Sequence, residues 1–304
     1  MTVLLFLWGS FAAASKIALE SLDNYQIQFY MFGSATLINT AIIAYTGRMK
    51  AVLSLSLKDI SKLLLIGLPY YFYFLLYILS LNKIPVVEAS MLNYLFPLFI
   101  VLLSAFMFGE RLTPSKTASI LLGLVGMIII VTDGNMSAIR LTDLGGDLLA
   151  ISGALCWALF SVFGKKSRTD QDLGIYLFTI TSFVLSSFGL FFFSNLTAPD
   201  MKGIGTTIWL AVSNIVLGNI LWFRGLRSPS STLIANLSYL TPFVTLLFIV
   251  ILLGEQLKTA QIGGFIVILS GIALQVATDK IRKPGIRTES RSKAGSKEQS
   301  SSLK

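Results

Sequence analysis

The side chains of this chain that could do chemistry are amides, carboxylates and aromatic rings set inside or beside long apolar runs. Histidine is absent and cysteine occurs once, at Cys156. These counts exclude imidazole-dependent triads, HExxH metal sites, intramolecular disulfides and cysteine-rich metal clusters. We therefore expect no catalytic residues, no cofactor and no metal, and look for groups that recognise a small molecule by hydrogen bonds and ring contacts.

Asparagine and tyrosine side chains at two places in the chain are candidates for binding a substrate. Asn93 and Tyr94 lie in one apolar run, and Asn236 and Tyr239 lie in another. An amide is costly in hydrocarbon unless it is hydrogen-bonded. These four side chains could present donors to a carboxylate or an amide of a substrate, or they could bond neighbouring helices to one another.

Each of these places is followed by a proline in the same apolar run, Pro97 or Pro242. A proline within a helix removes a backbone donor and kinks the helix, which frees the carbonyl four residues earlier. Pro97 would free the carbonyl of Asn93, and Pro242 that of Ser238. We expect either a hinge beside a watery cavity or a static kink.

Four aromatic side chains, Trp8, Tyr77, Trp157 and Trp222, are further candidates for the substrate site. They could stack on a flat apolar substrate or bind an ammonium group by a cation–π contact. Aromatic residues of membrane proteins also form interface belts or simply pack. Tyr77 matches Trp222 at an offset of 145 residues and Trp8 matches Trp157 at 149, which favours the binding role.

The acidic side chains fall near the ends of the apolar runs, and Glu88 and Asp147 sit deepest. A carrier driven by protons needs a titratable group at membrane depth. These two residues are therefore candidates for coupling to protons, with facilitated diffusion as the alternative. Glu110 and Glu255 each follow a glycine expected to end a helix, so we expect their carboxylates to be solvated.

The elements that position these residues are predicted to be membrane-spanning helices. The 304 residues are 54% hydrophobic and 13% charged, whereas soluble domains have about 25% charged residues. Apolar stretches able to cross about 30 Å of hydrocarbon recur at 3–21, 26–46, 62–81, 88–108, 115–132, 146–164, 174–194, 205–223, 231–252 and 260–278. The sequence predicts an all-α polytopic membrane protein with ten transmembrane helices.

The distribution of lysine and arginine predicts the orientation. Most of the 24 fall in the connections 47–61, 109–117, 165–173 and 224–230 and in the tail 279–304, which are cytoplasmic if both termini lie inside. The net charge of +9 is concentrated in the Ser- and Lys-rich tail, which we expect to be disordered and to face anionic headgroups. We therefore expect no nucleic acid as a partner.

The two halves of the chain repeat one another. The stretch from Tyr94 to Pro97 and the later Gly109-Glu110-Arg111-Leu112 recur 145 residues on, from Tyr239 to Pro242 and at Gly254-Glu255-Gln256-Leu257. Each half holds five predicted spans, so the two copies must cross the membrane in opposite directions. The sequence predicts two inverted five-helix repeats, 1–133 and 134–278, with the substrate site between them.

This doubled pattern of Trp-Gly near the start, a proline within a helix, Gly-Glu-x-Leu and a closing glycine-rich helix resembles the EamA-type drug/metabolite transporters. The resemblance covers about residues 3–278 and implies a ten-helix exporter of metabolites. The segment Glu88–Pro97 is similar to that of the aromatic amino acid exporter branch. One departure is Met31-Phe32, where the family commonly has an arginine before an aromatic residue.

The sequence and the resemblance together predict a secondary transporter that exports small metabolites, such as aromatic or other neutral amino acids, across the cytoplasmic (inner) membrane by alternating access. Its partners would be the substrate, the lipid bilayer and protons, and it would act as a monomer or weak homodimer. Uptake or exchange of sugar-nucleotides or phosphate esters is an alternative that needs a cationic site, from Lys16, Lys165 or Arg224. A membrane enzyme lacks the acidic metal motifs and histidines it would use, and a channel or receptor is a further alternative.

Overall fold

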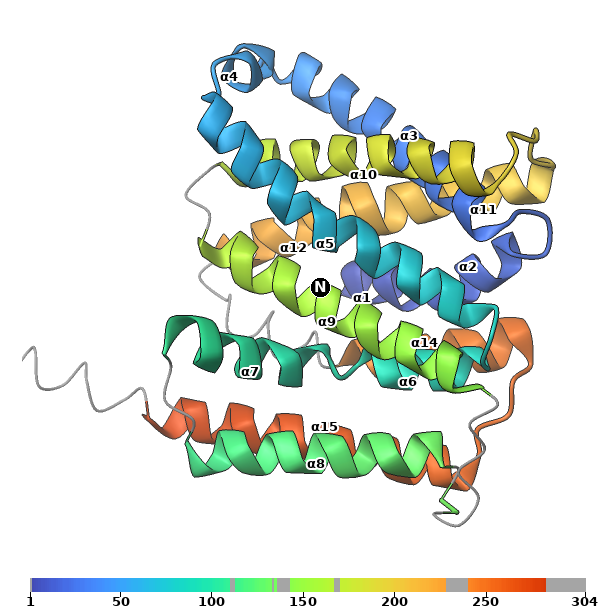
Figure 1. The fold of residues 1–304 in the computed structure, drawn as a ribbon, viewed down its shortest axis with the longest axis vertical. Coiled ribbons are helices and arrows are strands. Elements are labelled where there is room, and N and C mark those ends of the chain that lie inside the picture. The colour runs from blue at the N-terminus through green and yellow to red at the C-terminus, as the bar shows by residue number, and fades with distance from the viewer. Residues whose placement is uncertain are drawn as a thin grey trace, which may run out of the picture.

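The computed structural model describes residues 2–109, 113–132, 134–135, 143–166, 170–227 and 240–282, and every regular element in these ranges is a helix (Figure 1). In chain order the helices are α1 (Thr2–Gly9), α2 (Phe11–Ala18), α3 (Asn24–Tyr45), α4 (Met49–Leu53), α5 (Leu57–Leu81), α6 (Val86–Asn93), α7 (Phe96–Phe108), α8 (Pro114–Val131), α9 (Leu144–Lys166), α10 (Gln171–Phe193), α11 (Met201–Leu210), the π-helix η2 (Ala211–Leu217), α12 (Gly218–Arg227), α14 (Thr241–Phe248), the π-helix η4 (Ile249–Leu253) and α15 (Thr259–Arg282).

The helices confirm an all-helical membrane protein. Six helical stretches are long and apolar enough to cross a bilayer: Asn24–Tyr45, Leu57–Leu81, Val86–Phe108, Leu144–Gly164, Gln171–Phe193 and Met201–Trp222. Four shorter apolar helices accompany them, Thr2–Ala18, Thr117–Ile130, Thr241–Leu253 and Thr259–Leu274. Each predicted span thus falls on helical chain, although 231–252 is described only from residue 240.

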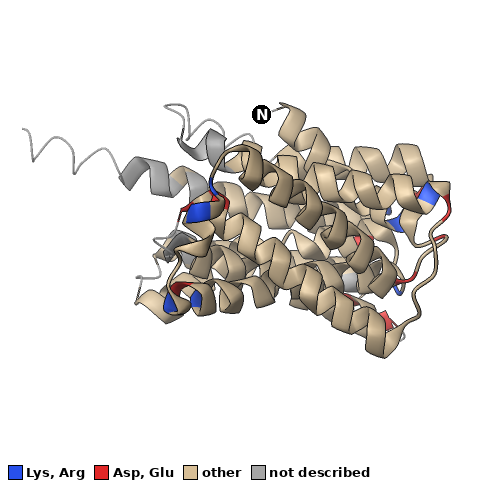
Figure 2. Cartoon of the chain, turned by 90° about the horizontal axis from the view of Figure 1, so that it is seen from above, with Lys and Arg blue, Asp and Glu red and all other residues tan. Residues whose placement is uncertain are grey.

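The helices pack side by side, and charged residues gather mostly at the two ends of the bundle (Figures 1 and 2). α5 packs on α9 in the middle, α3 and α10 pair at one edge, and α8 and α15 pair at the other. We call the end that holds the start of α6 and the start of α9 the distal end. The proximal end, opposite to it, holds α4 and the start of α10.

Local sequence explains where several helices begin and end. The side chains of Asp23, Ser56 and Asp200 accept hydrogen bonds from backbone N–H groups of the first turns of α3, α5 and α11. Gly109 and Gly254 end α7 and η4 in the left-handed conformation, with φ of 65° and 67°. The prediction that these two glycines end helices is therefore confirmed, and matched positions of the two halves have matched backbones.

The prolines interrupt their helices differently from the prediction. Pro97 lies in the first turn of α7, and α6 has already ended at Asn93. A first-turn proline gives up no helical hydrogen bond, because its N–H would have had no partner there. The helical pattern is interrupted at Tyr94-Leu95 and resumes at Phe96, so Pro97 lies at a helix start and not in the middle of one continuous helix. Pro242 likewise lies in the first turn of α14.

Candidate functional site

Aromatic side chains of α5 and α9 form the centre of the candidate site. Tyr70, Tyr73 and Tyr77 lie three and four residues apart on α5 and so share one face of that helix. The ring centroid of Trp157 lies 4.7 Å from that of Tyr73, and the ring of Phe160 lies 4.6 Å from Tyr70. We call these five residues the α5–α9 aromatic cluster.

The tyrosine hydroxyls of this cluster are held by polar side chains from other helices. The hydroxyls of Tyr77 and Ser90 share a hydrogen bond of 2.8 Å, and the amide nitrogen of Asn93 donates to the Tyr73 hydroxyl at 3.4 Å. The Asn219 amide donates to the Tyr70 hydroxyl at 3.0 Å. The structure therefore brings together three predicted site residues, Tyr77, Asn93 and Trp157.

The Asn93 side chain has an unused acceptor. Its residue is 6% exposed, and its Oδ1 has no hydrogen-bond partner among the described residues. A buried carbonyl without a donor costs free energy comparable to a lost hydrogen bond. Tyr73, to which Asn93 is bonded, and Trp157, whose ring packs on that of Tyr73, are only partly buried. This oxygen is therefore chemically able to accept a further hydrogen bond.

Trp8 and Trp222 form a second group, with ring centroids 5.3 Å apart. Among the described residues no ring contact joins this pair to the α5–α9 aromatic cluster. Gly218 makes the position of Trp8 possible, since a Cβ there would lie 2.4 Å from the indole nitrogen. We predicted one site for all four aromatic residues. In this conformation they lie in two separate aromatic groups.

A polar cluster beside Trp8 was not predicted. The Ser10 hydroxyl, at the break between α1 and α2, donates to the carbonyl of Leu7 at 2.8 Å and accepts from the Trp209 indole at 2.9 Å. The Asn214 amide, in η2, donates to the Ser213 hydroxyl at 2.8 Å. Broken helices and π-helices are common at functional sites. In the sequence, the pair Gly9-Ser10 inside an apolar run could have indicated this break.

Tyr94 joins the two halves of the chain instead of entering the aromatic cluster. Its hydroxyl shares a hydrogen bond of 2.8 Å with that of Thr245 on α14, and its ring lies 6.1 Å from Phe265 on α15. Tyr239, its counterpart 145 residues on, and the candidate Asn236 lie outside the described residues.

The two predicted coupling residues lie together at the distal end. Glu88 is in the first turn of α6 and Asp147 in the first turn of α9, and these two helices pack together. Asp147 is 5% exposed. Its Oδ1 accepts no hydrogen bond from the described part of the chain.

Glu255 is half-buried and hydrogen-bonded to the start of α6, which corrects the prediction of a freely solvated carboxylate. Its two carboxylate oxygens accept hydrogen bonds from the backbone N–H groups of Val86 and Val87, each at 2.9 Å. α6 begins after Pro85, whose side chain cannot cap a helix. The unpaired N–H groups of a helix N-terminus favour an anion, and here the second half of the chain supplies it. Glu110 lies outside the described residues.

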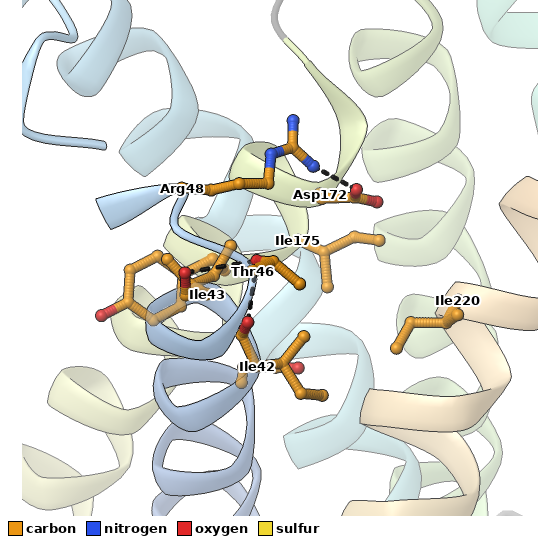
Figure 3. A pocket seen from close by; sticks show the side chains of 9 residues that line it. Ile42, Ile43, Thr46, Arg48, Asp172, Ile175 and Ile220 are labelled. Carbon is orange, nitrogen blue, oxygen red and sulfur yellow. Dashed lines mark hydrogen bonds and ion pairs between the residues drawn. The ribbon is translucent and has the colours of Figure 1, made fainter. Parts of the chain in front are cut away.

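The proximal end carries an ion-pair cluster and a small pocket (Figure 3). Arg48 contacts Asp172 and lies 2.8 Å from Asp170, tying the chain after α3 to the start of α10. Burial alone would raise the pKa of Asp170. Hydrogen bonds from Arg48 and from the backbone N–H groups of Leu173 and Asp172, together with the Arg48 charge, outweigh burial and hold that pKa below its ordinary value.

The pocket beside Arg48 is mostly apolar and encloses about 90 Å³. Pockets for drug-sized ligands are about 300 Å³ or larger, so we assign this one no substrate. The ammonium group of Lys16 donates to the carbonyl of Leu81 at 2.6 Å, at the end of α5, where a cation also complements the helix dipole. The side chains of Lys165 and Arg224 are outside the part of the chain that is described.

Comparison with known proteins identifies the family. The profile of the EamA-like transporter family matches residues 1–132 and again residues 144–277. The chain belongs to the EamA-like transporter family. This match confirms the resemblance predicted from the sequence. It also confirms the prediction that the protein is a transporter and not an enzyme.

Individual relatives agree with this membership. An uncharacterized transporter of Archaeoglobus fulgidus is 26% identical over 91% of this chain and 96% of its own length. The aromatic amino acid exporter YddG of Ancylobacter novellus is 29% identical over 61% of this chain and 64% of its own. A solved crystal structure with 22% identity superposes with a TM-score of 0.67 over 93% of this chain and 96% of that one, which shows a shared fold.

Proposed function

We propose that this EamA family member exports neutral amino acids, aromatic ones foremost, across the cytoplasmic membrane. The observation that carries the proposal is the Oδ1 of Asn93, which accepts no hydrogen bond from the described residues, next to Tyr73, whose ring packs on Trp157. An α-ammonium group of a substrate would donate to this oxygen, and an aromatic side chain would stack on the rings. The similarity to an aromatic amino acid exporter supports the same substrate class.

We further propose that ten helices form two inverted five-helix halves, 1–133 and 134–278, with both termini cytoplasmic. The twofold family match and the matched conformations of Gly109 and Gly254 support this arrangement. Substrate would bind between the halves. The path would be lined by Trp8, Tyr94, Trp222, Asn236 and Tyr239, and Pro97 and Pro242 would act as hinges. Export would proceed by alternating access in the bilayer, from a monomer or weak homodimer.

Purified protein in liposomes tests the substrate class directly. Radiolabelled Phe, Tyr, Trp and Thr should exchange across the membrane with saturable kinetics, and cells that overexpress the protein should resist toxic analogues of these amino acids. Flat traces for all four would overturn the proposed substrate. Exchange of a sugar-nucleotide or a phosphate ester instead would establish the alternative carrier, and non-saturable flux would indicate a channel.

A further inference from the structure

At the distal end, a carboxylate of the second half holds the first turn of a helix that belongs to the first half. Glu255 accepts hydrogen bonds from the backbone N–H groups of Val86 and Val87, each at 2.9 Å. Pro85, at the N-cap position of α6, provides no side-chain hydrogen bond of its own. Hydrogen bonds from helix N-terminal N–H groups to a carboxylate are charge-assisted and therefore stronger than those to a neutral acceptor.

The position of Glu255 in the chain allows this contact to break without the loss of a helix. The residue follows Gly254, whose left-handed conformation ends η4. It thus lies in the connection between η4 and α15 and outside both helices. Glu255 can therefore leave the start of α6 while every helix of both halves stays folded.

A second part of the other half packs on the connection before α6. Ile84, in this connection, is 4% exposed. Its Cγ2 would lie 2.6 Å from a Cβ added to Gly146, in the first turn of α9. The start of α6 is therefore held between α9 on one side and the connection that carries Glu255 on the other, and both belong to the second half.

The last turn of α6 carries residues of the candidate site. Ser90 shares a hydrogen bond with the Tyr77 hydroxyl, and Asn93 donates to the Tyr73 hydroxyl. α6 has eight residues, which corresponds to a length of about 12 Å. A displacement of its first turn therefore also moves the groups that contact the α5–α9 aromatic cluster.

We propose that Glu255 is the latch of the distal end: its bonds to α6 keep this end closed, and the end opens when Glu255 leaves α6. Because Ser90 and Asn93 lie on the same helix, ligand binding at the aromatic cluster and release of the latch affect each other's equilibrium. The inference rests on the proposed alternating-access function, in which the two ends open in turn.

Reaction of a buried cysteine with a soluble maleimide reports opening without any substrate. The cysteine replaces Ile84 in a Cys156→Ser protein, held in lipid nanodiscs so that the reagent reaches both ends. It should react slowly in the parent protein, since the closed end buries this position. Glu255→Ala should raise the labelling rate about tenfold, because it removes bonds that only the closed state makes. Glu255→Gln keeps one acceptor oxygen and should give an intermediate rate.

Two controls separate opening of this end from other effects. Glu20→Gln removes an exposed ion pair with Lys202 that also joins the halves at the distal end, and it should leave the labelling rate unchanged. Ala35→Cys, fully buried on α3, reports global unfolding and should react slowly in every variant. An unchanged rate for Ile84→Cys in Glu255→Ala, or an equal rise at Ala35→Cys, would overturn the proposal.

A cross-link between the halves tests whether opening is needed for transport. Asn82 is exposed before α6, and Gly145 lies where an added Cβ meets no atom within 4 Å. A short bifunctional maleimide should join cysteines at these two positions, because their neighbours Ile84 and Gly146 are in contact. The cross-linked protein should lose L-phenylalanine exchange in liposomes, whereas each single-cysteine variant treated with the same reagent should keep it. Exchange by fully cross-linked protein, or failure of the cross-link to form, would contradict the proposal.

The two readouts distinguish failure of the latch from failure of the proposed function. If phenylalanine does not exchange in the parent protein but labelling of Ile84→Cys responds to Glu255→Ala, the substrate proposal fails and the latch stands. If phenylalanine exchanges while labelling is the same with and without Glu255, the latch fails and the transport proposal stands.

Discussion

At the scale of single residues, hydrogen bonds from polar side chains hold the aromatic rings of the candidate site in place. Three tyrosine hydroxyls on one face of α5 each have a partner on another helix: Ser90, Asn93 or Asn219. These bonds fix the ring orientations before any ligand binds, which reduces the entropy that binding must overcome. Asn93 differs from the other two because its Oδ1 also accepts no hydrogen bond from the described residues.

Asn93→Ala should therefore impair transport more than folding. It removes both the bond to Tyr73 and the acceptor offered to a ligand. Loss of about one hydrogen bond to substrate corresponds to about a tenfold fall in L-phenylalanine exchange. Asn82→Ala, at an exposed turn, serves as the control. Exchange by Asn93→Ala at the parent rate, with equal amounts of folded protein, would show that the site lies elsewhere.

Glycine substitutions test the second aromatic group. In Gly218→Ala the new Cβ would lie 2.4 Å from the Trp8 indole nitrogen and 2.7 Å from the Ser213 carbonyl oxygen, so Trp8 must move. We expect the thermal unfolding temperature in detergent to fall, by an amount equivalent to about 1–3 kcal/mol. Gly205→Ala, where the Cβ meets no atom within 4 Å, should leave the protein as stable or more so. Equal behaviour of the two variants would contradict the packing of Trp8 on Gly218.

At the scale of elements, the bundle is held partly by contacts in which one half completes a helix of the other. α6 lacks a cap of its own because Pro85 precedes it, and Glu255 provides one. The sequence could predict that the helices exist and that glycines end α7 and η4, but it placed the prolines within helices and not at helix starts. It could not predict the role of Glu255, because the sequence near Glu255 holds no sign of the helix that it caps.

Removing this cap should be costly. Glu255→Ala leaves two N–H groups at the start of α6 without acceptors, for an expected loss of about 1–3 kcal/mol in unfolding free energy. Glu255→Gln keeps an oxygen and should fall between the parent and the alanine variant. The control is Glu20→Ala, which removes an exposed ion pair with Lys202 and should change stability by about 1 kcal/mol or less. Identical melting of all the Glu255 variants would argue against the capping role.

The Arg48–Asp170 contact predicts a pH dependence of stability at the proximal end. The pKa of Asp170 is lowered in the fold, chiefly by Arg48 acting against burial. Ionised Asp170 therefore contributes fully to the free energy of unfolding above its ordinary pKa of about 3.9. This contribution is lost as the pH falls through the lowered pKa. Asp170→Asn should melt below the parent at neutral pH, and the two should converge in strong acid. A difference that stays constant with pH would exclude this origin.

At the scale of the whole molecule, the contacts between connections agree with ten crossings. Arg48 reaches Asp170 and Asp172, Lys202 reaches Glu20, and Glu255 reaches the start of α6. A ten-span chain places the partners of each contact on the same side of the membrane. The repeat and the presence of the helices could be read from the sequence. The separation of Trp8 and Trp222 from the α5–α9 aromatic cluster could not, since it depends on how helices from both halves pack.

Cysteine labelling tests the proposed orientation, starting from Cys156→Ser. A membrane-impermeant maleimide added to intact cells should label cysteines at Asn82 and Gly145, in connections after the third and fifth spans. It should reach cysteines at Ser54 and at Ser300 in the tail only after the membrane is permeabilised. This alternation follows from an even number of crossings with most lysine and arginine inside. Labelling of Ser300→Cys in intact cells would show the opposite orientation. Labelling of Asn82→Cys and Ser54→Cys from the same side would show one crossing fewer, which would exclude the inverted arrangement of the halves.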